Sequence, residues 1–252
     1  MKVAAKKHLG QHFLKNAEVC NRIAECVDDN ALRCLEIGPG TGALTRELLQ
    51  RFSNRLSVIE IDDESVMYLQ RFFPELNGAI ISGDFLKMDF SSLGWNKFNI
   101  IGNFPYNIST QIIFKVIEHR DDVPQVVGMF QREVAQRFAA PPGSKTYGIT
   151  SVLTQAYYRV DYLFEVPPEY FDPPPKVHSA VIKLTRDVSL DPKCNYMNLK
   201  NVVKTAFNQR RKTLRNSLKG LMGSIEIPAH LLQKRPEQLS VRDFEEITLL
   251  LE

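Results

Sequence analysis

The sequence lacks the long apolar segments and the cysteine patterns that define several protein classes. No apolar run approaches the roughly 18 residues of a membrane span, and the first 14 residues lack the continuous apolar stretch of a signal peptide. The four cysteines have neither metal-ligand spacing nor the density of a disulfide scaffold; they are Cys20, Cys26, Cys34 and Cys194. We therefore expect a soluble cytoplasmic protein with reduced cysteines, no metal site and no membrane partner.

Charge is nearly balanced over the whole chain but not along it. The formal net charge is only +3, yet the residues from Val188 to the end hold 11 Lys and Arg against 7 Asp and Glu. Within residues 200–219 there are seven basic side chains and no acidic one. A basic helix face is often merely solvated, but a bias this one-sided favours contacts with nucleic-acid phosphates.

Short β-rich apolar runs alternate with helical stretches, which is typical of a parallel α/β sheet. The predicted strands are Cys34–Ile37, Leu56–Ile61, Ala79–Ser82, Phe98–Ile101, Gln125–Phe130 and Ala180–Leu184. The predicted helices are Leu44–Phe52, Glu64–Phe73 and Thr110–Ile117, and a basic helical region, one long helix or two short ones, starts near Asn198. The polar stretch Asp187–Asn195 marks a boundary between a large domain, residues 1–187, and a small helical domain, residues 188–252.

A glycine-rich segment, Glu36–Gly42, follows the first predicted strand and opens a helix. Glycines such as Gly38 let the backbone turn tightly and approach a ligand closely, so a nucleotide-like ligand is expected there. The spacing fits a dinucleotide as well as it fits S-adenosylmethionine. Glu60, at the end of the next strand, is placed to accept hydrogen bonds from the ribose hydroxyls of either cofactor.

Asp84 is a second acidic residue at the carboxyl end of a strand. It follows Ala79–Ser82 and is suited to the amino group of an adenine, with Phe85 as an apolar neighbour. An aspartate in this position is more often a helix cap. Because ligands of open α/β sheets bind beyond the carboxyl ends of the strands, we favour a ligand role for Asp84.

The tetrapeptide Asn103-Phe104-Pro105-Tyr106 ends the fourth predicted strand and indicates the chemistry. An adenine amino group is a poor nucleophile because its lone pair is delocalised, so it needs hydrogen-bond acceptors more than a base. The Asn103 amide oxygen and a carbonyl of the Pro105 turn supply two acceptors that align the nitrogen with a methyl donor. Tyr106 offers a ring on which an extruded base stacks. We therefore expect adenine N6 methylation, and a purely structural turn is the alternative.

Taken together, the motifs resemble the ribosomal RNA adenine dimethyltransferase family over nearly the whole chain. The matching segments are Lys7–Leu14, Glu36–Gly42, Asn103–Ser109, Phe130–Arg137, Val166–Val177 and Phe207–Asn216. The resemblance implies a Rossmann-like α/β methyltransferase domain with a small C-terminal helical domain. It also implies S-adenosylmethionine as methyl donor and small-subunit ribosomal RNA as partner, with dimethylation of two adjacent adenines in a hairpin loop near the 3′ end during ribosome biogenesis. We expect a monomer that acts on an immature 30S particle.

Carried over to this sequence, the resemblance implies two sets of site residues. The cofactor contacts are His12, Leu14, Gly38, Glu60, Asp84 and Asn103, and the catalytic residues are Asn103, Pro105, Tyr106 and Phe171. Two positions depart from the common pattern: His12 stands where many members have Asn, and Phe104 replaces a common Leu. Without the family, Val166–Val177 reads as a stiff proline-rich connection.

Three other functions fit parts of the pattern. A large-subunit ribosomal RNA adenine methyltransferase shares similar catalytic motifs, and a DNA adenine methyltransferase shares the catalytic tetrapeptide. A ribosome-assembly checkpoint that works mainly by binding the immature subunit belongs to a different class, and it is compatible with catalysis. The run Phe171–Val177 and the basic segment favour the small-subunit enzyme over its large-subunit counterpart.

Overall fold

The computed structural model, which describes residues 3–30 and 32–252, forms two compact units. The first lies within residues 1–135 and 161–186, and the second comprises residues 136–160 and 187–252. The domain boundary after Asp187 stays a prediction. Within the described residues, every helix is too short or too polar to cross a membrane.

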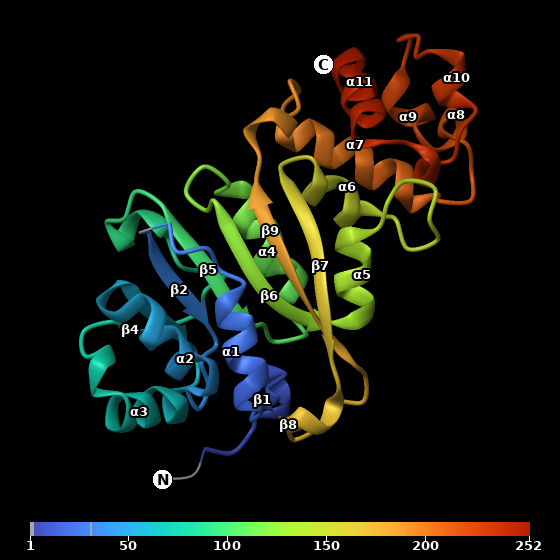
Figure 1. The fold of residues 1–252 in the computed structure, drawn as a ribbon. Coiled ribbons are helices and arrows are strands. Elements are labelled where there is room, and N and C mark those ends of the chain that lie inside the picture. Colours follow the sequence, from blue (N-terminus) through green and yellow to red (C-terminus); the bar gives the residue numbers. More distant parts are fainter. Residues whose placement is uncertain (1–2, 31) are drawn as a thin grey trace. The chain divides into compact units, whose positions relative to one another are not determined.

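A seven-stranded sheet is the main feature of the fold, with the strand order β4-β3-β2-β5-β6-β9-β7 (Figure 1). Its strands are β2 (Arg33–Ile37), β3 (Leu56–Glu60), β4 (Ile80–Ser82), β5 (Phe98–Asn103), β6 (Gln125–Gln131), β7 (Tyr158–Val166) and β9 (Ser179–Arg186). The five strands from β4 to β6 are parallel, and β9 runs antiparallel to β6. The prediction of a mostly parallel α/β sheet is thereby confirmed.

One strand of this sheet was absent from the sequence prediction. Strand β7 contains no apolar run longer than three residues, because Arg159, Asp161 and Glu165 interrupt it. Its middle residues are only partly buried, as expected for a strand at the edge of a sheet. The apolar-run criterion that found the buried central strands therefore passed over it.

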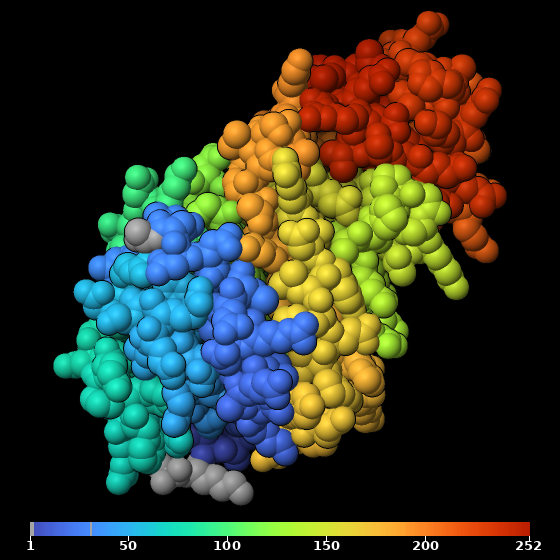
Figure 2. Space-filling model, in the orientation of Figure 1, coloured from blue at the N-terminus to red at the C-terminus, as the bar shows by residue number. Residues whose placement is uncertain are grey.

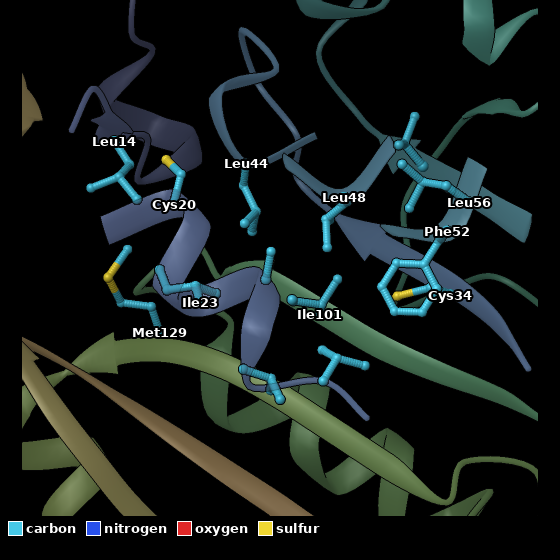
Figure 3. Packing of buried hydrophobic residues seen from close by; sticks show 14 of the residues in the cluster. Leu14, Cys20, Ile23, Cys34, Leu44, Leu48, Phe52, Leu56, Ile101 and Met129 are labelled. Carbon is cyan, nitrogen blue, oxygen red and sulfur yellow. The ribbon is translucent and has the colours of Figure 1, made fainter. Parts of the chain in front are cut away.

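Three helices contribute to the buried core on one face of the sheet. The helices of the first unit are α1 (Ala17–Glu25), α2 (Ala43–Phe52), α3 (Asp63–Phe72) and α4 (Ser109–Glu118), and α5 (Arg132–Ala139) continues into the second unit. Figure 3 shows Ile23 of α1 and Leu48 of α2 directed toward Ile101 of β5 and Met129 of β6, within one buried cluster. Burial of these side chains fixes the strand ends that carry the candidate site.

The chain before α1 forms an N-terminal arm, residues 6–14, that pairs with a distant segment. Its end, β1 (Phe13–Leu14), forms a two-stranded antiparallel sheet with β8 (Phe171–Asp172), and the two lie side by side in Figure 1. Next to this pair, the guanidinium of Arg22 lies 3.7 Å from the centre of the Phe164 ring. Figure 2 shows the resulting junction, where the blue N-terminal surface borders the yellow surface of the 160s.

The second unit is helical. Its helices are α6 (Ile149–Gln155), α7 (Tyr196–Asn208), α8 (Leu214–Ser217), α9 (Lys219–Met222), α10 (Ala229–Leu232) and α11 (Val241–Leu251). The basic segment, residues 200–219, was expected to form one long helix or two short ones. It forms instead most of α7, all of α8 and the start of α9, because the polar run from Gln209 to Lys212 provides no apolar residue to continue the buried face of α7.

Candidate active site

One pocket lies at the carboxyl ends of β2, β3 and β5 in the first unit. It encloses about 660 Å³ including its open mouth, a size that suits a small-molecule ligand. Seven of the nine predicted site residues line it: His12, Leu14, Gly38, Glu60, Asn103, Pro105 and Tyr106. The structure thus brings the N-terminal arm, the glycine loop and the catalytic tetrapeptide together around one cavity.

The glycine loop turns in a way that needs glycine. Gly38, Gly40 and Gly42 all have positive φ, at 68°, 55° and 78°. At Gly40 a Cβ atom would lie 2.7 Å from Cε1 of Phe13, so the loop also lets the arm pack directly on its backbone. The arm and the loop therefore form two adjoining walls of the pocket.

Glu60 organises the loops around it through backbone hydrogen bonds. Its carboxylate accepts from the amides of Gly40, at 3.0 Å, and of Ile61 and Asp62, both at 2.9 Å. Burial raises the pKa of Glu60, and the three N–H donors oppose that rise. A carboxylate has about four acceptor sites. Glu60 therefore keeps capacity for a ribose hydroxyl while it holds the glycine loop.

Glu36 is a pocket residue whose carboxylate the sequence analysis did not single out. Its side chain is almost fully buried on β2 and accepts a hydrogen bond from the Thr45 hydroxyl at 2.7 Å. Burial raises its pKa to about 8, with a smaller contribution from the charge of Glu60. The sequence did carry a signal for Glu36. It is a charged residue in a central parallel strand, at one of the four buried positions Cys34–Ile37.

Glu36 makes stability depend on pH in a predictable direction. A carboxyl with a pKa of about 8 in the folded protein and 4.5 otherwise binds a proton that the unfolded chain has lost. Stability from this group is therefore lost as pH rises between those values, by up to about 1.4 kcal/mol per pH unit. In Glu36→Gln this loss disappears, so the melting temperature of the variant relative to wild type should rise from pH 5 to pH 8.5. Exposed Glu18→Gln is the control, and parallel curves for all three proteins would contradict the prediction.

Asn103 ends β5 with its side-chain amide oriented by the arm. Its Nδ2 donates to the carbonyl of His12 at 2.8 Å. Because an amide has its donor and its acceptor on opposite branches, this bond leaves Oδ1 as an acceptor on the other side. Within residues 3–30 and 32–252, no side-chain or backbone donor is bonded to Oδ1. The pocket thus has an acceptor whose direction the arm has fixed.

Tyr106 is held by two neighbours. Its hydroxyl shares a 2.6 Å hydrogen bond with Ser179, and its ring is stacked with the His12 imidazole at 5.4 Å between centroids. Burial raises the pKa of Tyr106, and the bond to Ser179 opposes the rise. The His12 ring in turn donates from Nδ1 to the carbonyl of Pro173 at 2.7 Å. His12 therefore joins the arm, the catalytic tetrapeptide and the proline-rich segment.

Phe104 anchors the tetrapeptide in the core. Its ring is 1% exposed and makes an edge contact with Phe130, at 5.3 Å between centroids. A Cβ on Gly128 would lie 2.4 Å from Cε2 of this ring, and a Cβ on Gly102 would lie 2.8 Å from its Cε1. The two glycines thus make room on β5 and β6 for this aromatic ring.

Gly128→Ala should therefore destabilise the protein. The added methyl overpacks a rigid site between Phe104 and Phe130, at an expected cost of about 1–3 kcal/mol in the free energy of unfolding. Gly220→Ala is the matched control, since nothing lies within 4 Å of its added Cβ and it is in helix α9. Urea titrations of both variants test this, and equal midpoints would contradict it.

The structure places the remaining two predicted residues outside the pocket lining. The Phe171 ring is 1% exposed and belongs to the buried cluster that also contains Leu14. Asp84 caps its own turn by accepting from the amide of Leu86 at 2.9 Å and faces Lys87 at 3.8 Å. Their proposed contacts with the base and the cofactor stay predictions.

Known proteins resemble this chain over nearly its whole length. The family model described as ribosomal RNA adenine dimethylase matches residues 2–248. The chain is 55% identical over 252 residues to ribosomal RNA small subunit methyltransferase A of Parabacteroides distasonis, covering 98% of this chain and 94% of that protein. It is 52% identical over 257 residues to the protein of the same name from Porphyromonas gingivalis, covering 100% and 99%.

Solved structures show the same architecture. A dimethyladenosine transferase from Plasmodium falciparum superposes with a TM-score of 0.77 at 27% identity, covering 94% of this chain and 96% of that one. The 23S rRNA methyltransferase ErmE superposes with a TM-score of 0.65 at 24% identity, covering 93% and 98%, which shows a shared fold.

Proposed function

The chain belongs to the ribosomal RNA adenine dimethylase family, and we propose that it dimethylates two adjacent adenines in a hairpin loop near the 3′ end of small-subunit ribosomal RNA. It is an S-adenosylmethionine-dependent enzyme that methylates adenine N6 in 16S ribosomal RNA. The observation that carries the proposal is the orientation of Asn103, whose amide oxygen is left as an acceptor beside the pocket.

The pocket residues fit the cofactor. S-adenosylmethionine supplies a methyl group on a sulfonium. The glycine loop at Gly38 gives close backbone approach, and Glu60 accepts from the ribose hydroxyls. His12 and Leu14 form the wall contributed by the arm. Asp84 lies outside the pocket lining, in the turn after β4, and would accept from the adenine amino group of the cofactor. The carboxylate of Glu60, which accepts from three backbone N–H groups, favours a cationic ligand over a neutral one.

The tetrapeptide aligns the target base. Asn103 Oδ1 and the carbonyl of Phe104 each accept one N–H of the target amino group, which directs the nitrogen lone pair toward the methyl donor. The Pro105 turn sets the two acceptors at a fixed distance from each other. Tyr106 stacks on the extruded base, with its own ring backed by His12. Phe171 is proposed to stack on the base opposite Tyr106, which requires its buried ring to turn out of the core when the base binds.

The proposed substrate is an immature 30S particle in the cytoplasm. The chain is proposed to bind it as a monomer. A hairpin loop offers unstacked bases that enter the pocket without breaking a duplex. Basic side chains of residues 200–219 contact the RNA phosphates. Within that segment Arg210 is committed internally, because it donates to the carbonyl of Lys145 at 2.7 Å.

Transfer of tritium from labelled cofactor to immature small subunits tests the proposal. We expect incorporation into small-subunit RNA, mapped by mass spectrometry to two neighbouring dimethyladenines, and none into large subunits treated in parallel. Incorporation into large subunits alone would favour the large-subunit alternative. No incorporation by a protein that still binds the cofactor would overturn the proposal.

A further inference from the structure

A turn of the chain after β4, residues 84–90, carries the aspartate proposed to recognise the adenine of the cofactor. The main-chain carbonyl of Asp84 accepts from the amides of Lys87 and Met88, at 3.0 and 3.1 Å, and its carboxylate accepts from the amide of Leu86. These bonds fix how the carboxylate points within the turn. They do not fix the turn relative to the sheet.

A lysine from another element supplies that attachment. Lys115 of α4 donates from its ammonium to the carbonyl of Leu86 at 3.0 Å and to the carbonyl of Met88. The same ammonium lies 5.5 Å from the centre of the Phe85 ring and 5.1 Å from that of Phe90, both of which are buried. One cation thus binds two carbonyls and two rings of a single turn.

The ammonium of Lys115 is partly removed from water. Burial lowers the pKa of Lys115, and the charges of Asp84, Asp89 and Glu118 oppose that change. A partly desolvated ammonium interacts more strongly with its partners than an exposed one. Lys87, which also faces Asp84, has a side chain that is 86% exposed and a contact of 3.8 Å.

Lys115 connects two parts of the site, the Asp84 turn and the helix that follows the catalytic tetrapeptide. Helix α4 begins at Ser109, directly after the catalytic motif, and Lys115 lies on its second turn. We propose that Lys115 is a positioning residue, whose ammonium ties the Asp84 turn to the catalytic helix so that the Asp84 carboxylate can recognise the amino group of the cofactor's adenine. This inference rests on the ligand role of Asp84 within the proposed function.

Binding of two product analogues tests it without RNA. S-adenosylhomocysteine carries the adenine amino group and S-inosylhomocysteine lacks it, so the ratio of their dissociation constants reports the Asp84 contact. By calorimetry, Lys115→Met should raise the constant for S-adenosylhomocysteine about tenfold and that for S-inosylhomocysteine less than twofold. Lys87→Met, which also removes one positive charge near Asp84, should change both less than twofold.

The possible outcomes are distinct. Equal weakening of both ligands by Lys115→Met would show a general structural role and overturn the inference, as would values that match Lys87→Met. Lys115→Gln keeps one donor and should lose part of the discrimination; it replaces the Met variant if that variant does not fold. A wild-type protein that binds both analogues equally would also overturn it. A wild-type protein that discriminates between them but methylates no ribosomal RNA would instead contradict the proposed function alone.

Discussion

Replacing Asn103 with alanine is expected to lower the rate of methyl transfer by about 10²–10³-fold, the usual effect of removing one preorganised hydrogen-bonding group at a reacting centre. The variant loses the acceptor for the adenine amino group, and the His12 carbonyl of the arm loses its Asn103 donor. Cofactor affinity should fall by less than about tenfold, because the glycine loop and Glu60 remain in place. Single-turnover transfer of labelled methyl groups, together with calorimetry, measures both quantities.

Two further variants make the interpretation of Asn103→Ala specific. Asn107→Ala removes the other asparagine side chain of the same loop, which donates to the carbonyl of His8 at 3.5 Å, and should keep transfer within about threefold of wild type. Asn103→Asp keeps an oxygen but faces the His12 carbonyl without a donor, so it should be as inactive as the alanine variant. Activity above a tenth of wild type in Asn103→Ala would exclude the acceptor role of Asn103, and such activity in Asn103→Asp alone would exclude the need for the bond to the His12 carbonyl.

Replacing Arg211, Lys212 and Arg215 together with glutamine should weaken RNA binding about 100-fold at 0.1 M salt. All three side chains are exposed and lie in the basic segment between α7 and α9. Each phosphate contact to single-stranded nucleic acid contributes about 0.7 to the slope of log affinity against log salt, so three lost contacts lower that slope by about 2. Filter binding of a ribosomal RNA hairpin over a range of salt concentrations gives both values.

The control for this triple variant removes the same charge elsewhere. Arg71, Lys97 and Lys193 are exposed and lie outside the basic segment, so changing these three to glutamine should leave the salt slope unaltered. If both triple variants weaken binding equally, net charge rather than the basic segment determines affinity. Cofactor binding should be unaffected in both.

The central strands could be predicted because burial on both faces leaves long apolar runs. The predicted range Gln125–Phe130 differs from β6 by a single residue at its end. Strand β7 has no such run. Strands β1 and β8 are two residues each, and the pairing of β1 with β8 depends on tertiary contacts between segments more than 150 residues apart. Local patterns carry no information about such contacts.

Motif spacing likewise located the pocket but not the packing within it. The residues at strand ends, such as Glu60 and Asn103, lie where the parallel sheet requires them. The burial of Phe171 follows from the pairing of β8 with β1, which no motif encodes. The internal bonds of Arg210 arise from the neighbouring Ser144–Lys145 turn, so its charge in the sequence could not distinguish it from the exposed arginines.

The pairing of the arm with β8 also sets the order in which the molecule can become functional during synthesis. The arm emerges first, yet its partners Phe171, Asp172 and Pro173 follow it by about 160 residues, as the separation of 161 between His12 and Pro173 shows. A nascent chain that ends before residue 171 already contains the glycine loop and the catalytic tetrapeptide. The arm that forms the neighbouring wall, however, has no β8 to pair with. Contacts between such distant segments form late in folding. Tight cofactor binding should therefore begin only when translation has passed this point.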